Sequence, residues 1–313
     1  MSTALAIPLF LVSLVVTLFA ARTFARRLDR LGTKLGLPEP LIGLLTALAA
    51  DGPEISAALF ALAKGANSVG VGVLVGSNTF NIAAMLGVSA LIAGSVCLPR
   101  RALLLEGTAG AAVTLIASAL LLGWISPGLA AVLAAGAIVP YLLLLLGERR
   151  PRARSETRQP EGHGATHHLL GLIALDVTLI VAASAGMVQA ALTLGQHWHI
   201  SNAALGVLIL APLTSIPNAI TGVRLGAAGR GTALVGETFN SNTINLAAGV
   251  IVPSLFVTLG VLSATGKAQL GWLVGMTAVT LALLATRGGI HRPQALLLIA
   301  LYAGFVATQL FGG

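Results

Sequence analysis

The sequence predicts an all-α integral membrane protein of about ten transmembrane helices, arranged as two inverted five-helix repeats. Three observations support this prediction: the composition, the lengths of the apolar segments and the distribution of the basic residues. Of the 313 residues, 56% are hydrophobic and 9% are charged, and the mean hydropathy is +0.94. A soluble domain carries about 25% charged residues, so this chain has more apolar surface than one water-facing fold can bury.

The apolar segments run for about 18 to 28 residues, long enough for helices to cross a hydrocarbon layer about 30 Å thick. The first segment resembles a signal peptide in hydrophobicity, but Arg22, Arg26 and Arg27 follow it and no basic residue precedes it. This charge order is the reverse of a signal peptide, so we expect the segment to be retained as a span. The expected spans cover residues 4–21, 38–63, 68–95, 102–123, 127–146, 169–191, 203–225, 232–262, 268–285 and 294–311.

The Lys and Arg residues separate sharply between alternate connections of these spans. One side holds only Lys64 and Lys267. The other side holds Arg22, Arg26, Arg27, Arg30, Lys34, Arg100, Arg101, Arg149, Arg150, Arg152, Arg154, Arg158, Arg224, Arg230, Arg287 and Arg292. The positive-inside rule then predicts a multi-pass protein of the cell membrane with the basic side cytoplasmic and both termini outside. The net charge of +8 therefore reports topology, and we expect no nucleic acid partner.

A hydrophilic stretch at residues 148–168, rich in Pro, Gly, Ser and charges, is typical of a cytoplasmic linker. It would separate a first five-helix repeat, residues 1–147, from a second, residues 169–313. Because five is odd, two similar halves must lie in opposite orientations, a common plan among transporters. Residues 53–91 match residues 217–255 at thirteen of thirty-nine positions, including Ser-Asn-Thr-x-Asn at 77–81 and 241–245. A polar motif repeated inside an apolar span indicates two related halves.

The second expected span carries two carboxylates, Asp51 and Glu54, near its middle. Each costs about 2.5–3.5 kcal/mol on insertion scales, so intramembrane carboxylates usually face a cavity or a partner. Pro53 has no N–H, which leaves the carbonyl of Ala49 without its helical donor, and Gly52 loosens the same turn. Broken backbone of this kind can coordinate cations where it lines a cavity. The alternative is a proline kink with two protonated carboxyl groups held for packing.

The second repeat has the same proline but no carboxylate, since Asn218 follows Pro217 and the freed carbonyl is that of Leu213. The other candidates are neutral: Ser77, Asn78, Asn81, Thr214, Ser215, Ser241, Asn242 and Asn245. Together they form an all-oxygen set suited to hard cations such as Ca²⁺ or Na⁺ rather than Zn²⁺ or Cu. As direct metal ligands we favour Asp51, Glu54, Asn81, Asn218 and Asn245. The alternative is that Ser and Asn only hydrogen-bond between helices.

Three further acids lie within or beside the spans. Glu237 precedes Ser241 by one helical turn and is either an accessory vestibule carboxylate or a span-end residue reaching water. Asp176 has either a gating or proton role or an interhelical hydrogen bond. Glu106 is expected to snorkel to the membrane interface. Cys97 is alone, so no intramolecular disulfide is possible.

Each repeat resembles an α-repeat of the calcium/cation antiporter superfamily, especially its prokaryotic sodium/calcium exchanger branch. The family pattern is roughly G-T-S-x-P-E, followed later by G-S-N-x-x-N. Here Pro53-Glu54 and Gly76-Ser77-Asn78-Thr79-Phe80-Asn81 match it, as do Thr214-Ser215-Ile216-Pro217 and Ser241-Asn242-Thr243-Ile244-Asn245. The resemblance implies a sodium/calcium exchanger-like fold and alternating-access exchange of Ca²⁺ against Na⁺ or H⁺, with no cofactor. It also implies a ligand set of Glu54, Ser77, Asn81, Thr214, Ser215 and Ser241, with the positions of Asn218 and Asn245.

This sequence departs from the family pattern at the acids. Asn218 and Asn245 stand where acidic residues are expected or often seen in the second repeat, and Ala50-Asp51 replaces the Thr-Ser pair of the first. Two central charges could still neutralise one Ca²⁺, two Na⁺ or two H⁺. Asp51 and Glu54 are also close enough to titrate as a coupled pair, which weakly favours H⁺ as the counter-ion.

The expected function is therefore secondary active cation antiport, with membrane lipid and transported cations as the only partners and no protein partner. One alternative keeps the fold but moves Na⁺/H⁺ or Mg²⁺, and another is a degenerate, non-transporting homologue. An intramembrane aspartyl enzyme would need aspartates from two helices, and the second repeat offers only Asn218. We expect no enzyme activity.

Overall fold

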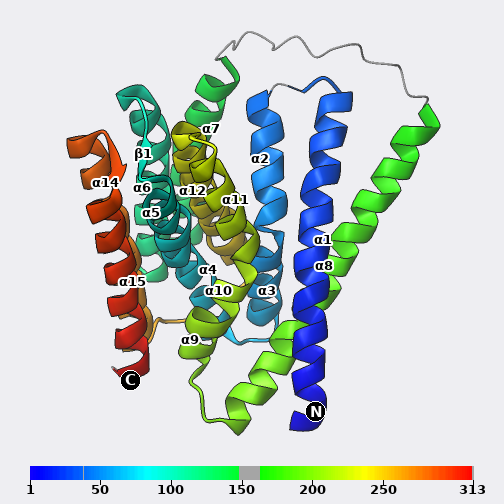
Figure 1. Ribbon diagram of the computed structural model, residues 1–313. Helices are drawn as coiled ribbons and strands as arrows, with labels where there is room; N and C mark the ends of the chain where they lie inside the picture. Colours follow the sequence, from blue (N-terminus) through cyan, green and yellow to red (C-terminus); the bar gives the residue numbers. More distant parts are fainter. Residues whose placement is uncertain (38, 148–162, 312–313) are drawn as a thin grey trace.

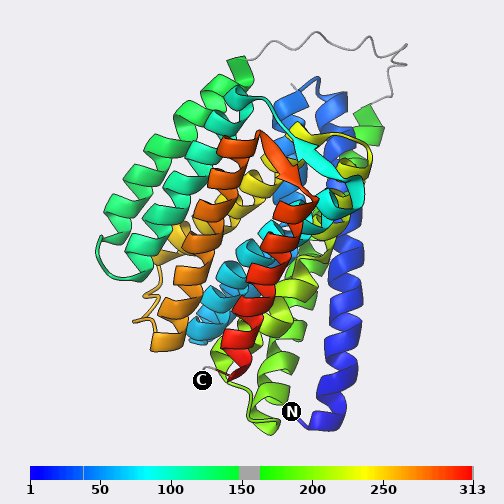
Figure 2. The same ribbon diagram turned by 60° about the vertical axis from the view of Figure 1, so that its left-hand side comes forward.

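The computed structural model describes residues 1–37, 39–147 and 163–311, which are almost entirely helical. Figures 1 and 2 show the helices packed side by side as one bundle, with both termini at the same end. A membrane-spanning backbone must satisfy its polar groups internally, and helices do this for an apolar chain. The predicted all-α membrane fold is confirmed.

The helices before the predicted linker begin with the long α1. They are α1 (Thr3–Lys34), α2 (Glu39–Ala50), α3 (Gly52–Ala63), α4 (Asn67–Asn81), α5 (Ser89–Ala93), α6 (Arg100–Leu121) and α7 (Pro127–Gly147). A π-helical segment, η1 (Ile82–Val88), joins α4 to α5, and a short strand, β1 (Ser95–Cys97), precedes α6.

The helices after the predicted linker follow a similar order. They are α8 (His163–His197), α9 (Asn202–Ala204), α10 (Ala211–Thr214), α11 (Ile216–Ala227), α12 (Gly231–Leu246), α13 (Val252–Ser254), α14 (Ala264–Arg287) and α15 (Arg292–Phe311). The π-helical segments η2 (Leu205–Leu210) and η3 (Ala247–Ile251) lie between α9 and α10 and between α12 and α13. Strand β2 (Gly289–His291) pairs antiparallel with β1.

Among the described residues, seven helices are long and apolar enough to cross a membrane, and two bent pairs raise this number to nine. The sequence prediction was about ten. The difference is the predicted span 232–262, where α12, η3 and α13 run continuously over residues 231–254. This stretch contains Glu237, Asn240, Asn242 and Asn245, so it is less apolar than the others. Residues 255–263 leave the helix, and the predicted end at 262 was wrong.

Other span boundaries also differ from the prediction. Helix α1 continues to Lys34, well beyond the predicted end at residue 21. Helix α8 begins at His163 and ends at His197, so residues 163–168 of the predicted linker are helical. Residues 148–162 of that linker lie outside the described part of the chain. Helices outlast the apolar run because amphipathic turns can continue into the interface, where water solvates the polar face.

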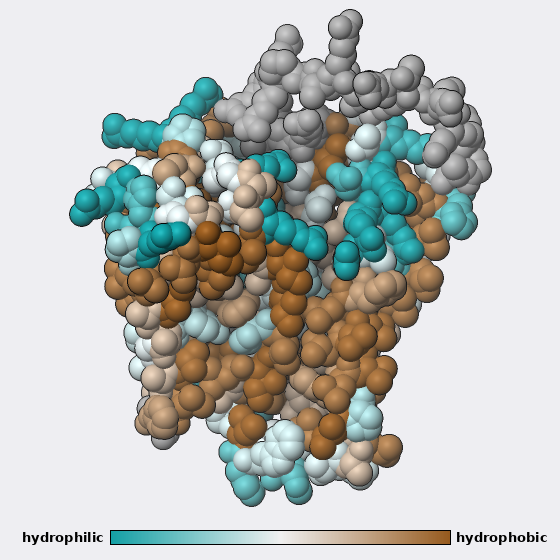
Figure 3. Space-filling view, viewed as in Figure 1, coloured by the Kyte–Doolittle hydropathy of each residue, from teal (hydrophilic) through white to brown (hydrophobic). Residues whose placement is uncertain are grey.

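The surface has the layered pattern of a protein in a bilayer. Figure 3 shows a broad hydrophobic belt, with hydrophilic residues gathered above it at the end where α1 finishes and α6 begins. Arg22, Arg26, Arg30 and Arg100 lie on these two helix ends and are exposed. We call this end the arginine-rich end. The β1–β2 pair lies there as well (Figure 1).

The central helix is the one formed by α4, η1 and α5. Within its most apolar window, 94% of the residues are buried, against 17–44% in the other six unbroken spans. In this helix, α4 ends with the motif Ser77–Asn81, and the wider π-helical segment η1 follows. In the same way, η3 follows α12 directly after the motif of the second half. π-Bulges inside α-helices occur often at functional sites. The sequence analysis did not predict these bulges.

Two helix pairs are bent at prolines, as the sequence predicted. The helix axes change direction by 51° between α2 and α3 and by 48° between α10 and α11. Pro53 and Pro217 each stand in the first turn after the bend. Because proline donates no N–H, the carbonyls of Ala49 and Leu213 lack their usual helical donors.

Gly206 is required for the close packing of η2 on α4. A Cβ atom at Gly206 would lie 2.6 Å from the backbone oxygen of Val69, which cannot move aside without shifting α4. Gly136, on α7, is also helical, but a Cβ atom there would meet nothing within 4 Å. The two positions therefore form a matched pair for testing this contact.

We predict that Gly206→Ala destabilises the protein whereas Gly136→Ala does not. Overpacking of a tight contact costs about 1–3 kcal/mol, which should lower the Tm by a few degrees. Both substitutions should gain the same helix propensity, so that term cancels. Thermal unfolding in detergent, followed by fluorescence-detected size exclusion, checks this. Equal melting temperatures for the two variants would show that η2 does not approach α4 this closely.

Candidate ion-binding site

The two helix breaks meet in the middle of the protein. Asp51 lies between α2 and α3, Glu54 lies in the first turn of α3, and both are 0% exposed. Asn218, in the first turn of α11, is 1% exposed and touches both of them. The polar motifs of α4 and α12 complete the region. The side-chain candidates that the structure buries here, each at most 4% exposed, are Asp51, Glu54, Ser77, Asn78, Asn81, Thr214, Ser215, Asn218, Ser241, Asn242 and Asn245.

The carboxylates are held by neutral donors. Ser241 Oγ donates a hydrogen bond of 2.6 Å to Asp51 Oδ1, and Asn218 Nδ2 donates one of 2.8 Å to the same oxygen. Asn218 Nδ2 also lies 3.2 Å from Glu54 Oε1, while Asn245 Nδ2 donates to Glu54 Oε2. One amide group therefore bridges the two carboxylates. Among the described residues, both acids accept hydrogen bonds from hydroxyl and amide groups, and no basic side chain pairs with them.

Asn78 and Asn242 tie α4 to α12 reciprocally. Asn78 Nδ2 donates to the backbone oxygen of Asn242 at 3.0 Å, and Asn242 Nδ2 donates to the backbone oxygen of Asn78 at 3.1 Å. Their side-chain oxygens accept from the next asparagines: Asn81 Nδ2 reaches Asn242 Oδ1, and Asn245 Nδ2 reaches Asn78 Oδ1. The two halves of the chain thus meet through the duplicated motif.

Several buried oxygens in this region have no hydrogen-bond partner among the described residues. They are Asp51 Oδ2, Ser77 Oγ, Asn81 Oδ1, Asn218 Oδ1 and Asn245 Oδ1. An unpaired polar atom buried in a protein costs about 1–3 kcal/mol. Such atoms need an explanation. Their concentration around two carboxylates indicates a place for a ligand that oxygens can bind, either a hydrogen-bond donor or a cation.

Thr214 and Ser184 differ from the other buried polar residues near this site. The Thr214 hydroxyl donates within its own helix, to the backbone oxygens of Leu210 at 2.9 Å and Ala211 at 3.2 Å. Ser184 on α8 lies with its Oγ 3.5 Å from the backbone oxygen of Pro53 and is fully buried. The sequence analysis missed Ser184, because α8 carries no motif that marks its inner face.

Asp176 joins α8 to α1. Thr23 Oγ1 donates a hydrogen bond of 2.7 Å to Asp176 Oδ1, and Arg27 Nη1 lies 2.5 Å from Asp176 Oδ2. Arg27 Nη1 also donates to the backbone oxygen of Leu172 on α8. The sequence left two interpretations of Asp176, a gating or proton role and an interhelical hydrogen bond. The structure contains the interhelical hydrogen bond. The sequence could not reveal this contact because Thr23 and Arg27 lie far from Asp176 along the chain.

Glu106 and Glu237 lie on the arginine-rich side of the central carboxylates. Glu106 was expected to snorkel to the interface, but it turns inward instead, and Tyr141 donates a hydrogen bond of 2.7 Å to its Oε2. That expectation was wrong because Tyr141 on α7 offers a buried donor. Glu237 is half-buried on α12, one helical turn before Ser241. Whether Glu237 acts as an accessory carboxylate stays a prediction.

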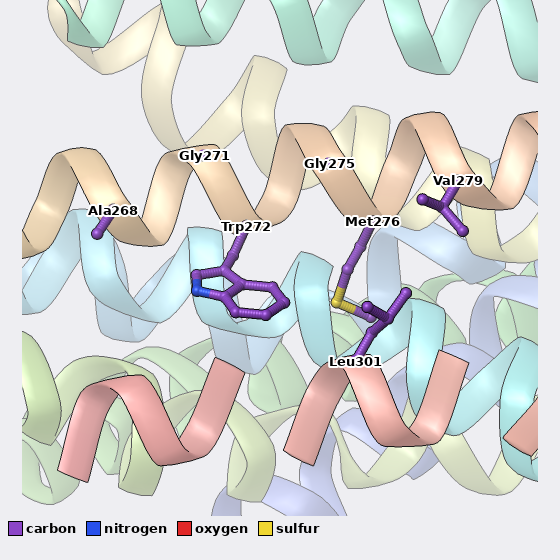
Figure 4. A pocket seen from close by; sticks show the side chains of 7 residues that line it. All are labelled: Ala268, Gly271, Trp272, Gly275, Met276, Val279 and Leu301. Atoms are coloured by element: carbon purple, nitrogen blue, oxygen red, sulfur yellow. The ribbon is translucent and has the colours of Figure 1, made fainter. Parts of the chain in front are cut away.

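The described residues contain no cluster of three or more His, Cys, Asp or Glu side chains that could hold a metal ion. Any cation here would therefore be bound mainly by neutral oxygens. An apolar groove of about 350 Å³ opens between α14 and α15, with Trp272, Met276 and Leu301 on its walls (Figure 4). None of the candidate ligands lines it, so this groove is separate from the polar centre.

Comparisons with known proteins agree with this geometry. The profile of the family described as sodium/calcium exchanger protein matches residues 5–147 and 168–311. The chain belongs to the sodium/calcium exchanger protein family. This exchanger-family chain is 25% identical, over 315 residues, to CaxA of Alkalimonas amylolytica, covering 94% of this chain and 95% of that protein.

Two solved exchangers share the fold of this chain. The H⁺/Ca²⁺ exchanger CAX matches with a TM-score of 0.76 at 18% identity, over 98% of this chain and 82% of that one. The sodium-calcium exchanger NCX_Mj, soaked with 10 mM Na⁺ and 10 mM Sr²⁺, matches with a TM-score of 0.68 at 20% identity, over 98% and 99%. Exchangers are transporters, so the expectation that the chain is not an enzyme is confirmed.

We predict that Arg27→Met alone destabilises this exchanger-family protein more than the double change Arg27→Met with Asp176→Leu. Removing one partner of a buried pair costs about 3–5 kcal/mol, because the other charge stays buried, whereas apolar replacement of both is close to neutral. The Arg27 side chain is 23% exposed, which lowers the expected cost of the single change. Thermal unfolding in detergent measures both. A double variant less stable than Arg27→Met would contradict this account of the α1–α8 contact.

Proposed function

We propose that this chain is a secondary active antiporter that exchanges Ca²⁺ for Na⁺ or H⁺ by alternating access at the site of Asp51 and Glu54. The observation that carries the proposal is the contact of Asn218 with both carboxylates, at 2.8 and 3.2 Å, in a fully buried polar centre. This contact places two acids of a membrane-spanning region around one point.

The two carboxylates call for a positively charged cargo. An unpaired ion inside a protein carries a desolvation penalty of several kcal/mol, which a nearby opposite charge or a proton removes. In the part of the chain that the structure describes, no basic side chain contacts Asp51 or Glu54. Ca²⁺, two Na⁺ or two H⁺ would each bring the pair to neutrality. Competition between such cargoes for the same two charges is the basis of antiport.

The asparagines supply the remaining ligands in this proposal. Asn81, Asn218 and Asn245 each direct an amide nitrogen toward an acceptor in the centre, while their amide oxygens are buried and unpartnered. Rotation of each amide by half a turn would exchange nitrogen for oxygen at the same place. The nitrogens would then stabilise the cation-free carboxylates, and the oxygens would coordinate the bound cation.

Neutral oxygens supply the number of ligands that Ca²⁺ prefers. Ca²⁺ takes about 6–8 oxygen ligands in flexible geometry, whereas Mg²⁺ demands a strict octahedron and keeps several waters. The two carboxylates, the three amides, Ser77 Oγ, and the carbonyls of Ala49 and Leu213 offer enough oxygens for Ca²⁺. Ser215 and Ser241 lie beside the carboxylates, whereas Asn78, Asn242 and Thr214 act in this account by positioning the helices.

The relatives support this choice of cargo. CaxA is named as a putative antiporter, CAX as an H⁺/Ca²⁺ exchanger and NCX_Mj as a sodium-calcium exchanger. Na⁺/H⁺ or Mg²⁺ transport on the same fold, or a non-transporting homologue, remain the competing functions. The replacement of the second-repeat acids by Asn218 and Asn245 is the feature that favours them.

The proposed arrangement is two inverted five-helix repeats, residues 1–147 and 169–313, with the linker 148–168 in the cytoplasm of a cell-membrane protein. Two structural features support it. Both termini lie at one end of the bundle (Figure 1), and the arginine-rich end is the opposite one, where α1 finishes and α6 begins. The positive-inside rule then places the arginine-rich end in the cytoplasm.

The test is Ca²⁺ uptake into liposomes containing the purified protein, with a Na⁺ gradient, a pH gradient or neither. We predict uptake driven by one gradient and lost in Glu54→Gln and in Asp51→Asn, since each removes half of the central charge. The uptake rate should fall at least about tenfold, or about 1.4 kcal/mol in activation free energy. Asp29→Asn, which removes an exposed acid of α1, is the matched control and should transport normally.

The outcome separates the candidate functions. Folded protein that moves no Ca²⁺ under either gradient would contradict Ca²⁺ exchange, and Na⁺/H⁺ and Mg²⁺ would be tried in the same vesicles. Uptake that survives both central substitutions would instead place the transport site elsewhere.

A further inference from the structure

Five arginines gather around the small β-sheet at the arginine-rich end. Strands β1 and β2 pair antiparallel there, with Ser95 opposite His291 and Cys97 opposite Gly289. The arginines lie on the segments that flank or touch these strands, and all five side chains are exposed. We call them the sheet-flanking arginines: Arg100, Arg101, Arg230, Arg287 and Arg292.

The strand pair brings the start of α6 to the end of α14. Leu98 N donates a hydrogen bond of 3.4 Å to the backbone oxygen of Gly288. Leu98 lies two residues before Arg100, and Gly288 directly follows Arg287, the last residue of α14. The first turn of α6, with Arg100 and Arg101, therefore begins beside the end of α14.

Two further helices begin against the same strands. Helix α15 starts at Arg292, directly after β2, and Arg292 Nη2 would lie 4.0 Å from a Cβ atom on Gly94, directly before β1. A Cβ atom on Gly231, the first residue of α12, would collide with the backbone oxygen of Cys97 in β1. Arg230 precedes Gly231, so it also stands beside β1. Three helix starts and one helix end thus present arginines around one strand pair.

Negative charge is scarce on these elements. The acids of α6, α12, α14 and α15 are Glu106 and Glu237 alone, and both are half-buried, whereas the arginines are exposed. Five arginines against two acids leave an excess of three positive charges even if both acids are ionised. Like charges held near one another repel, so the strand pair concentrates a charge that an anion would neutralise.

Most of the sheet-flanking arginines also stand at the unfavourable end of a helix. Aligned peptide dipoles give a helix N-terminus partial positive charge, so a basic residue destabilises that end and stabilises the other. Arg100, Arg101 and Arg292 lie in the first turns of α6 and α15, which contain no acidic residue. Arg230 directly precedes α12. An anion bound here would offset the repulsion from the helix ends as well as that among the arginines.

The level of this cluster in the membrane indicates which anion fits. The hydrophilic residues of the arginine-rich end lie directly above the hydrophobic belt (Figure 3), where lipid headgroups would surround the protein. Guanidinium groups bind phosphate oxygens through paired N–H donors. Basic groups at the ends of membrane-spanning helices bind anionic headgroups in this way.

We propose that the sheet-flanking arginines bind the phosphate groups of anionic phospholipids in the leaflet at the arginine-rich end. This inference does not rest on the proposed function, since none of these residues belongs to the polar centre. Strand β1 and helix α6 precede the predicted linker, whereas α12, α14, β2 and α15 follow it. A headgroup bound here therefore contacts both halves of the chain and stabilises the contact between them.

The test is the thermal stability of the purified protein in detergent during titration with phosphatidylglycerol, or with phosphatidylcholine, whose headgroup has no net charge. We expect phosphatidylglycerol to raise the Tm by several degrees, because a ligand that binds only the folded protein stabilises it. Phosphatidylcholine should raise it much less. The triple variant Arg230→Gln, Arg287→Gln, Arg292→Gln should need at least about tenfold more phosphatidylglycerol for the same rise, since each basic residue at an anionic surface strengthens binding about fivefold.

The matched control is the triple variant Arg22→Gln, Arg26→Gln, Arg30→Gln. It removes the same charge from the same end of the protein, but from exposed positions on the single helix α1. The control should respond to phosphatidylglycerol as the unsubstituted protein does. Arg292→Gln alone, which should weaken binding about fivefold, serves as the test if the first triple variant does not assemble.

Three outcomes would overturn the inference. Equal responses of the two triple variants would show that basic charge anywhere at this end attracts the lipid. Equal stabilisation by phosphatidylglycerol and phosphatidylcholine would show that headgroup charge is not recognised. Stabilisation by inorganic phosphate at the same concentration would show a site for free anions rather than for lipid.

Discussion

The structure depends on the burial of two carboxylates, Asp51 and Glu54, in a membrane-spanning region. Their partners among the described residues are hydroxyl and amide groups, with no basic side chain. Burial of this kind is tolerated only where charge is neutralised or strongly hydrogen-bonded. The bend at Pro53 brings the two acids to the middle of the bundle, and the second bend brings Asn218 against them. Charge balance is therefore left to whatever the site binds.

The neutral residues shape the chemistry as much as the acids do. Asn78 and Asn242 fix α4 against α12 through their backbone oxygens, so the motif of each half is held by the other half. Under the proposed function, Asn81, Asn218 and Asn245 can turn either end of an amide toward the centre, which suits a site that exists with and without a cation. The outer acids Glu106 and Glu237 break the likeness between the halves, and they do so on the arginine-rich side only.

Much of this architecture followed from the sequence because membrane burial makes polar residues conspicuous. Each proline break and each Ser-Asn-Thr-x-Asn motif stood out in an apolar span, and the structure buries the side chains of these breaks and motifs, whereas Asp176 lies apart at the α1–α8 contact. Helix ends were predicted poorly, since α1 and α8 run well past their apolar segments. The contacts of Glu106 with Tyr141 and of Asp176 with Arg27 were missed because they join residues far apart in the chain. The π-helical segments were missed because no composition marks them.

The most direct test of this account is the charge moved in each transport cycle. With two central carboxylates, one Ca²⁺ exchanges for two monovalent cations, and the cycle carries no net charge. Ca²⁺ uptake into liposomes can be measured while a K⁺ gradient and valinomycin set the membrane potential at negative, zero or positive values. We predict equal uptake rates at all three potentials and no steady transport current. A rate that rises or falls steadily with the potential would contradict the account, because a further charge would then have to be bound at the site.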